Sequence, residues 1–111
     1  MNRVTRYQSL SATVRKAHGS HLVGVVQCRS TSDIEANFEQ NQEYINQCVD
    51  RGASIVCLPE FFAYMHHPGI PSSWSEPLNG KVMEAYRKLA QNNRCWLSLG
   101  GFQEHENVTV K

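Results

Sequence analysis

The sequence predicts an α/β protein in which helices pack on a sheet. Two short apolar runs, at 22–27 and 53–58, are rich in β-branched residues, as expected of buried strands. Apolar residues recur at helical spacing over roughly 33–51 and again over roughly 80–92. A third apolar run, at 96–102, follows the second helix. This order of elements favours parallel strands joined by right-handed crossovers.

The first helix has sequence signals at both ends. Ser32 stands three residues before Glu35, the pattern of a capping box in which Ser32 is the N-cap and Glu35 reaches back. Gly52 suits the position just after the helix, where a left-handed backbone is common. One face of the helix gathers its apolar side chains, namely Ile34, Phe38, Ile45, Cys48 and Val49. We expect that face to pack on the sheet.

The second half of the chain begins with a loop. Pro59 closes the second strand because it cannot donate a ladder hydrogen bond. Residues 61–79 hold several aromatic residues, His66 and His67, and three prolines, so they are expected to be irregular. The next helix has an amphipathic pattern that includes Val82, Met83, Tyr86, Leu89 and Ala90. The strand at 96–102 has glycines near its end.

Composition and charge exclude several classes of protein. Hydrophobic residues make up 41% of the 111 residues and charged residues 19%, which fits a globular protein. No apolar run approaches the ~18 residues of a membrane span, so no membrane partner is expected. The net charge of +1 gives no reason to expect nucleic acid.

The charge is unevenly distributed along the chain. Residues 1–21 contain four bases and no acid, whereas the remainder has a net charge of −3. An arginine-bearing, serine- and threonine-rich, acid-free segment is typical of a mitochondrial transit peptide, and a disordered leader with no address is the alternative. We therefore divide the chain into a leader at 1–21 and a partial domain at 22–111, with a mitochondrial or cytoplasmic location.

Metal and cofactor sites are not expected. The four cysteines, Cys28, Cys48, Cys57 and Cys95, form no CxxC pair, and reduced, mostly buried packing residues are the better interpretation. His66 and His67 are adjacent, so they do not share a helix face, and no further ligand lies at metal-site spacing. Loop histidines are favoured over a metal or substrate contact.

Glu60 is the candidate catalytic residue. It follows a buried strand directly, at the carboxyl end where open α/β sheets bind ligands. Between Pro59 and two phenylalanines, Phe61 and Phe62, its carboxylate is expected to be partly desolvated, which raises a carboxylate pKa toward the range of a general base. The alternative is a carboxylate that caps the loop or a following helical turn.

Four segments in this order carry a resemblance to a known family. They are Val23-Gly24-Val25-Val26-Gln27, Ala53 to Phe62, Ser75 to Lys81, and Trp96 to Phe102. Over about residues 22–105 the chain resembles the nitrilase, or carbon–nitrogen hydrolase, superfamily. The last two segments are similar to the branch of Nit proteins that hydrolyse deaminated glutathione. The resemblance implies the amino-terminal part of an α-β-β-α sandwich, a small-molecule amide substrate and, in complete members, subunits that commonly pair.

The resemblance also implies a mechanism. Members of the family use a glutamate, a lysine and a cysteine, and Glu60 matches the glutamate, the general base. The cysteine attacks the amide carbon to form a thioester, and the lysine stabilises the oxyanion. The lysine and cysteine are expected beyond the third strand, after this sequence stops, and Lys88 is interpreted as a solvated helix residue. Three hypotheses stay open: an amidase acting on a small α-keto acid, an inactive or interaction-only fragment, and, as the least favoured, a small α/β binding module outside this family.

Three further residues have alternative interpretations. Tyr64 and Trp74 could contact substrate, but packing beneath the loop is favoured. Glu76, in a Ser-Glu-Pro segment, suits the N-terminus of the following helix, where the dipole stabilises a carboxylate.

Overall fold

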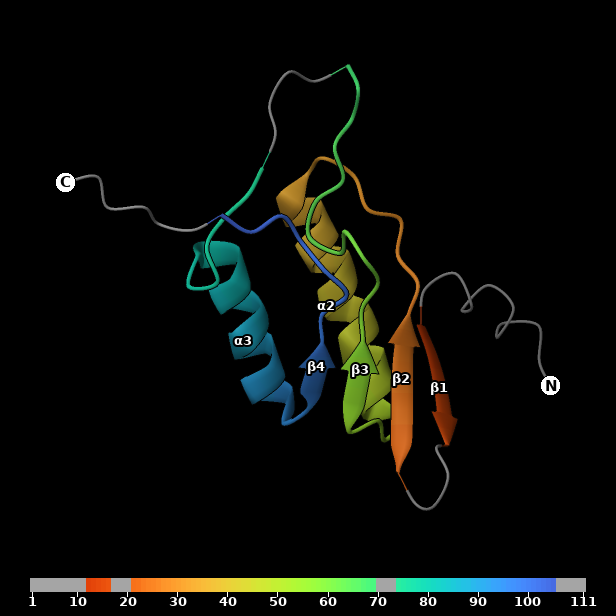
Figure 1. Ribbon diagram of the computed structural model, residues 1–111. Helices are drawn as coiled ribbons and strands as arrows, with labels where there is room; N and C mark the ends of the chain where they lie inside the picture. The colour runs from red at the N-terminus through yellow and green to blue at the C-terminus, as the bar shows by residue number, and fades with distance from the viewer. Residues whose placement is uncertain (1–11, 17–20, 70–73, 106–111) are drawn as a thin grey trace.

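A computed structural model describes residues 12–16, 21–69 and 74–105 of the chain. Four strands and two helices are present in these residues (Figure 1). In chain order they are β1 (Ala12–Lys16), β2 (Leu22–Val26), α2 (Ile34–Asp50), β3 (Ile55–Cys57), α3 (Lys81–Asn93) and β4 (Trp96–Ser98). The α/β class predicted from the sequence is confirmed.

The strands form one sheet in the order β1-β2-β3-β4. Strands β2, β3 and β4 are parallel, with Ile55 between Val23 and Trp96, whereas β1 runs antiparallel to β2. The parallel pairing around α2 confirms the predicted strand–helix–strand unit. Strand β1 was not predicted, because it falls in the basic segment assigned to a leader. The leader itself stays a prediction, since residues 1–11 and 17–20 lie outside the described residues.

The first helix begins one residue later than its sequence signals suggest. Asp33, not Ser32, is the N-cap, and its side chain accepts a hydrogen bond of 3.0 Å from the Ala36 amide. The predicted capping box of Ser32 and Glu35 is therefore wrong. Asp33 takes the N-cap position because a carboxylate is at least as good an N-cap as a hydroxyl. At the other end Gly52 has φ of +99°, as its predicted position after the helix requires.

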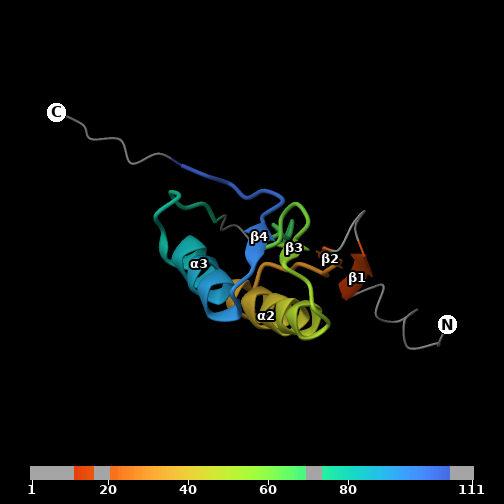
Figure 2. The ribbon, with the colours of Figure 1, turned by 90° about the horizontal axis from the view of Figure 1, so that it is seen from below.

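Both helices lie on the same face of the sheet, as the view from below shows (Figure 2). The side chains between the layers are buried: Val26, Ile45, Cys48, Val56, Leu58, Met83, Tyr86 and Leu89. Gly24 permits a close approach of β2 to α2, because a Cβ atom there would lie 2.8 Å from the Cβ of Cys48. The opposite face of the sheet is different: Val25, Ile55 and Trp96 are 49%, 38% and 77% exposed.

The four cysteines are free thiols, and Cys28, Cys48 and Cys95 pack in or against the core. Cys48 is buried, and Cys28, Cys57 and Cys95 are partly buried. Burial raises the pKa of the Cys48 and Cys95 thiols. No trio of His, Cys, Asp or Glu side chains within the described ranges could hold a metal ion. Neither α2 nor α3 is long and apolar enough to span a bilayer, and the described part of the chain has no other helix.

Candidate active site

Glu60 lies in a turn at the carboxyl end of β3, where the segments after β3 and β4 run side by side (Figure 1). Backbone hydrogen bonds join the two segments on either side of Glu60. The Leu58 amide donates to the Ser98 carbonyl at 2.9 Å, and the Phe61 amide donates to the Gly101 carbonyl at 3.0 Å. The turn that contains Glu60, the residue predicted to be catalytic, is therefore held by hydrogen bonds to β4 and to the segment that follows β4.

Gly100 allows this close approach of the two segments. A Cβ atom on Gly100 would lie 2.2 Å from the Pro59 carbonyl carbon and 2.5 Å from the Glu60 nitrogen, so a larger residue would displace the turn. Phe61 has φ of +57°, a left-handed conformation that is unfavourable for a residue with a side chain. Such strain persists only where the surrounding contacts fix the backbone, and it is common at functional sites.

The environment of the Glu60 side chain differs from the expected one. Glu60 is exposed, so partial desolvation by its aromatic neighbours is not found. Phe62 is fully buried and packs edge-on against Tyr86 at a centroid distance of 4.9 Å, while Phe61 is 38% exposed. The two phenylalanines therefore do not together shield the Glu60 carboxylate from solvent.

Two asparagines of α2 hold the residues that follow Glu60. Asn37 donates to the Ala63 carbonyl at 3.0 Å, and Asn41 donates to the Phe62 carbonyl at 2.9 Å. Both asparagines are buried, at 3% and 0% exposure. Neither asparagine was predicted as a site residue, because the apolar pattern of the helix identifies only its hydrophobic core residues. Their four-residue spacing, on the same face as the buried Ile45, was the signal that could have identified them.

Glu76 anchors the amino end of α3. Its carboxylate accepts hydrogen bonds from the Val82 and Met83 amides at 3.1 and 2.8 Å. The expectation of a carboxylate at this helix N-terminus is thus confirmed, although Glu76 precedes the helix by five residues. The backbone of Glu76 also pairs with that of Glu104, after β4. This pairing holds the segment before α3 against the segment that follows Gly101.

The remaining candidates have structural surroundings. Tyr64 is buried, with its ring 6.0 Å from that of Trp74, and Trp74 lies 6.1 Å from Phe102, which agrees with packing beneath the loop. His66 and His67 are exposed, and the Tyr64 hydroxyl lies 3.5 Å from the His66 Nδ1 atom. Lys88 is exposed on α3, as expected of a solvated residue.

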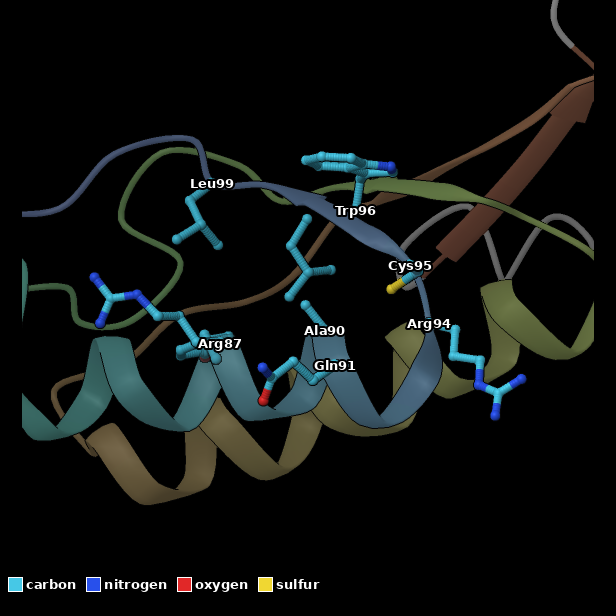
Figure 3. Close-up of a pocket in the computed structure, with 9 residues that line it drawn as sticks. Arg87, Ala90, Gln91, Arg94, Cys95, Trp96 and Leu99 are labelled. Atoms are coloured by element: carbon cyan, nitrogen blue, oxygen red, sulfur yellow. The ribbon is translucent and has the colours of Figure 1, made fainter.

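A groove of about 420 Å³ lies away from Glu60, between α3 and β4 (Figure 3). Its lining residues include Tyr86, Ala90, Cys95, Leu97 and Leu99, with Arg87 and Arg94 among the polar ones. Trp96 lies on the side of β4 opposite α3 (Figure 3). The groove is thus mainly an apolar opening along the last strand of the described sheet, and Glu60 does not line it.

Comparison with known proteins identifies relatives. Human deaminated glutathione amidase is 42% identical over 84 residues, which are 75% of this chain and 26% of the relative. The enzyme of that name from Dictyostelium discoideum is 38% identical over 74% of this chain and 30% of the relative. The NitFhit fusion protein of nitrilase and fragile histidine triad from Drosophila melanogaster is 36% identical over 82% of this chain and 20% of the relative. The chain spans less than a third of these relatives.

No solved structure matches the chain significantly. Residues 22–110 match the family described as carbon-nitrogen hydrolase, which covers the four segments that carry the resemblance. The parallel strands with α2 and α3 on one face are consistent with the amino-terminal part of a nitrilase-like fold. The chain belongs to the carbon–nitrogen hydrolase family of the nitrilase superfamily.

Proposed function

We propose that the chain is part of an amidase that hydrolyses deaminated glutathione or a similar small α-keto acid amide, with Glu60 as its general base. The position of Glu60 carries the proposal. Its carboxylate lies at the carboxyl end of a parallel strand, in a turn fixed by Gly100 and Gly101. The similarity to deaminated glutathione amidases supports this choice of substrate within the carbon–nitrogen hydrolases.

The proposed chemistry needs a base that acts twice. Glu60 takes the proton of a cysteine thiol, and the thiolate attacks the amide carbon. The tetrahedral intermediate collapses to a thioester, and the departing amine takes the proton that Glu60 received. The regenerated carboxylate then removes a proton from water, which attacks the thioester carbon. The carbon–sulfur bond breaks, the acid leaves, and the cysteine thiolate takes the proton back from Glu60. A lysine stabilises the oxyanion in both steps. Glu60 is the only one of these three groups to which this sequence has a match.

The test uses the protein expressed from its complete reading frame. Release of the amine from deaminated glutathione is measured for the natural protein, for Glu60→Gln and for Glu104→Gln. Glu104 is an exposed control in the segment that follows Gly101. Because Glu60 acts in both halves of the reaction, Glu60→Gln should lower kcat by a factor of about 10²–10⁴, while Glu104→Gln should leave kcat unchanged. An active protein in which Glu60→Gln has no effect would contradict the assignment.

A second candidate function is association with other carbon–nitrogen hydrolase subunits. The exposed apolar face formed by Val25, Ile55 and Trp96 favours it, since apolar surface of this kind is typical of protein interfaces. Sedimentation of the chain mixed with human deaminated glutathione amidase tests the candidate. A complex should form and should be weakened by Trp96→Ser, and separate sedimentation of the two proteins would contradict it.

A further inference from the structure

We propose that Asn41, assisted by Asn37, is a positioning residue that fixes the Glu60 turn from the side of helix α2. The link to catalysis rests on the proposed role of Glu60. The link to structure stands on the hydrogen bonds of the two asparagines.

Each asparagine uses both hydrogens of its side-chain amide. The Nδ2 atom of Asn41 donates to the Phe62 carbonyl and to the Tyr86 hydroxyl, both at 2.9 Å. The Nδ2 atom of Asn37 donates to the Ala63 carbonyl at 3.0 Å and to the Thr31 carbonyl at 2.7 Å. Two successive carbonyls, starting two residues after Glu60, are therefore held by one face of α2.

The backbone geometry explains why donors are needed there. The chain leaves β3 at Cys57 and turns at Phe61 in a left-handed conformation. The next two residues, Phe62 and Ala63, are buried but belong to no strand. Buried carbonyls outside the sheet require donors from elsewhere, because an unpaired one carries the cost of desolvation. The side-chain amides of α2 supply those donors.

Asn41 has a cost as well as two hydrogen bonds. Its Oδ1 atom is buried and has no hydrogen-bond partner among the described residues. A buried acceptor without a partner lowers stability. Asn41 therefore provides two donors at the expense of an unsatisfied acceptor, which is understandable if the position of the Phe62 carbonyl matters for more than folding.

The anchors act on Glu60 from two sides. On one side, the Phe61 amide is bonded to the Gly101 carbonyl, and Gly100 fits against the Pro59–Glu60 peptide. On the other side, Asn41 holds the carbonyl of the residue after Phe61. Removing either set should let the left-handed Phe61 relax toward a common conformation, and Glu60 would move with it.

Amide hydrogen exchange on the complete protein tests the anchor directly. The reporter is the Phe61 amide, and the internal reference is the Leu58 amide, which is bonded to Ser98 in the same strand pair. In Asn41→Ala, the protection of Phe61 relative to Leu58 should fall by about tenfold or more, because a buried hydrogen bond is lost locally. An unchanged ratio, or an equal loss at both amides, would overturn the proposal.

Two other variants complete the design. Asn93→Ala removes a comparable amide-to-carbonyl bond, 2.9 Å to Leu89 at the end of α3, and should leave the ratio unchanged. Asn41→Asp keeps the shape of the side chain and serves if the alanine variant does not fold. Its carboxylate cannot donate, but its neutral acid can donate to the Phe62 carbonyl. The protection of Phe61 should therefore rise as the pH falls, and its failure to do so would also count against the proposal.

Kinetics of the complete protein separate this inference from the proposed function. Asn41→Asp should lower kcat with little change in KM, and kcat should partly recover at low pH relative to the natural protein. If Glu60→Gln lowers activity and Asn41→Asp does not, the positioning role is overturned while the amidase assignment stands. If Glu60→Gln has no effect, the assignment of Glu60 fails, and hydrogen exchange still decides whether Asn41 holds the turn.

Discussion

The two faces of the sheet differ although they are built from the same strands. On the face toward α2 and α3, Val26 and Val56 are 2% and 0% exposed. Their immediate neighbours on the other face, Val25 and Ile55, are 49% and 38% exposed. Strand residues alternate between faces, so each apolar pair supplies one side chain to the core and one to the opposite surface.

The difference in exposure follows from where the two helices lie. Parallel sheets normally have both faces covered, and their strands are therefore apolar throughout. Strands β2 and β3 have that composition, but α2 and α3, the two helices of the described residues, both lie on one face (Figure 2). The covered face contains the chain's own core and the anchors of the Glu60 turn. The exposed face is suited to a second layer.

The largest effect on stability is expected from Tyr86, a residue of α3 that is buried in the core at 1% exposure. Burial raises the pKa of its hydroxyl to about 12, from about 10 in an unfolded chain. The native state therefore keeps the proton more tightly, so the contribution to stability is complete below pH 10 and is lost as the pH rises from about 10 to about 12. The loss should approach roughly 3 kcal/mol.

Urea unfolding between pH 9 and pH 12 measures this loss. Tyr86→Phe should remove the part of the decline that Tyr86 causes, and the buried thiols Cys48 and Cys95, whose pKa values are also raised, account for the rest. Tyr44→Phe, at a partly buried position on α2, should leave the whole decline in place. A decline of the same size in Tyr86→Phe would mean that another group dominates the alkaline unfolding.

A smaller difference in the free energy of unfolding is expected between variants at two adjacent residues of β3. Val56→Ala should lower the free energy of unfolding by roughly 2 kcal/mol, because two buried methyl groups are lost and a cavity remains. Ile55→Ala removes more atoms but from the exposed face, so its cost should be under about 1 kcal/mol. Denaturant unfolding of both variants measures the pair. Equal costs would show that something covers Ile55 in solution.

Periodicity was enough to predict the helices and three strands, because one-sided burial leaves a clear pattern in residues such as Ile45, Tyr86 and Val56. Strand β1 escaped prediction because its sequence, Ala-Thr-Val-Arg-Lys, has little apolar alternation and depends on pairing with β2. The third strand was predicted too long, since Gly100 and Gly101 leave the ladder to pass the Glu60 turn.

The position of Glu60 was readable from sequence because a carboxylate directly after a buried strand is a local pattern. Its exposure and its anchors were not readable in the same way. They depend on Asn37 and Asn41, some twenty residues earlier, and on Gly100, forty residues later. Contacts over such distances in the chain have no local signature, and polar residues on a buried face are the only indication that they leave.

The smallest expected effect on stability, and the most direct test of the open face, concerns Trp96. At 77% exposure its replacement by serine should change the free energy of unfolding by less than about 0.5 kcal/mol.

Two single-tryptophan variants, Trp74→Phe and Trp96→Phe, allow each indole to be quenched separately with acrylamide. Trp96 should be quenched several-fold more strongly than the partly buried Trp74. Protection of Trp96 that grows with protein concentration would indicate self-association. Protection at every concentration would mean that the face is closed within one chain, and the contrast between the two faces would then be wrong.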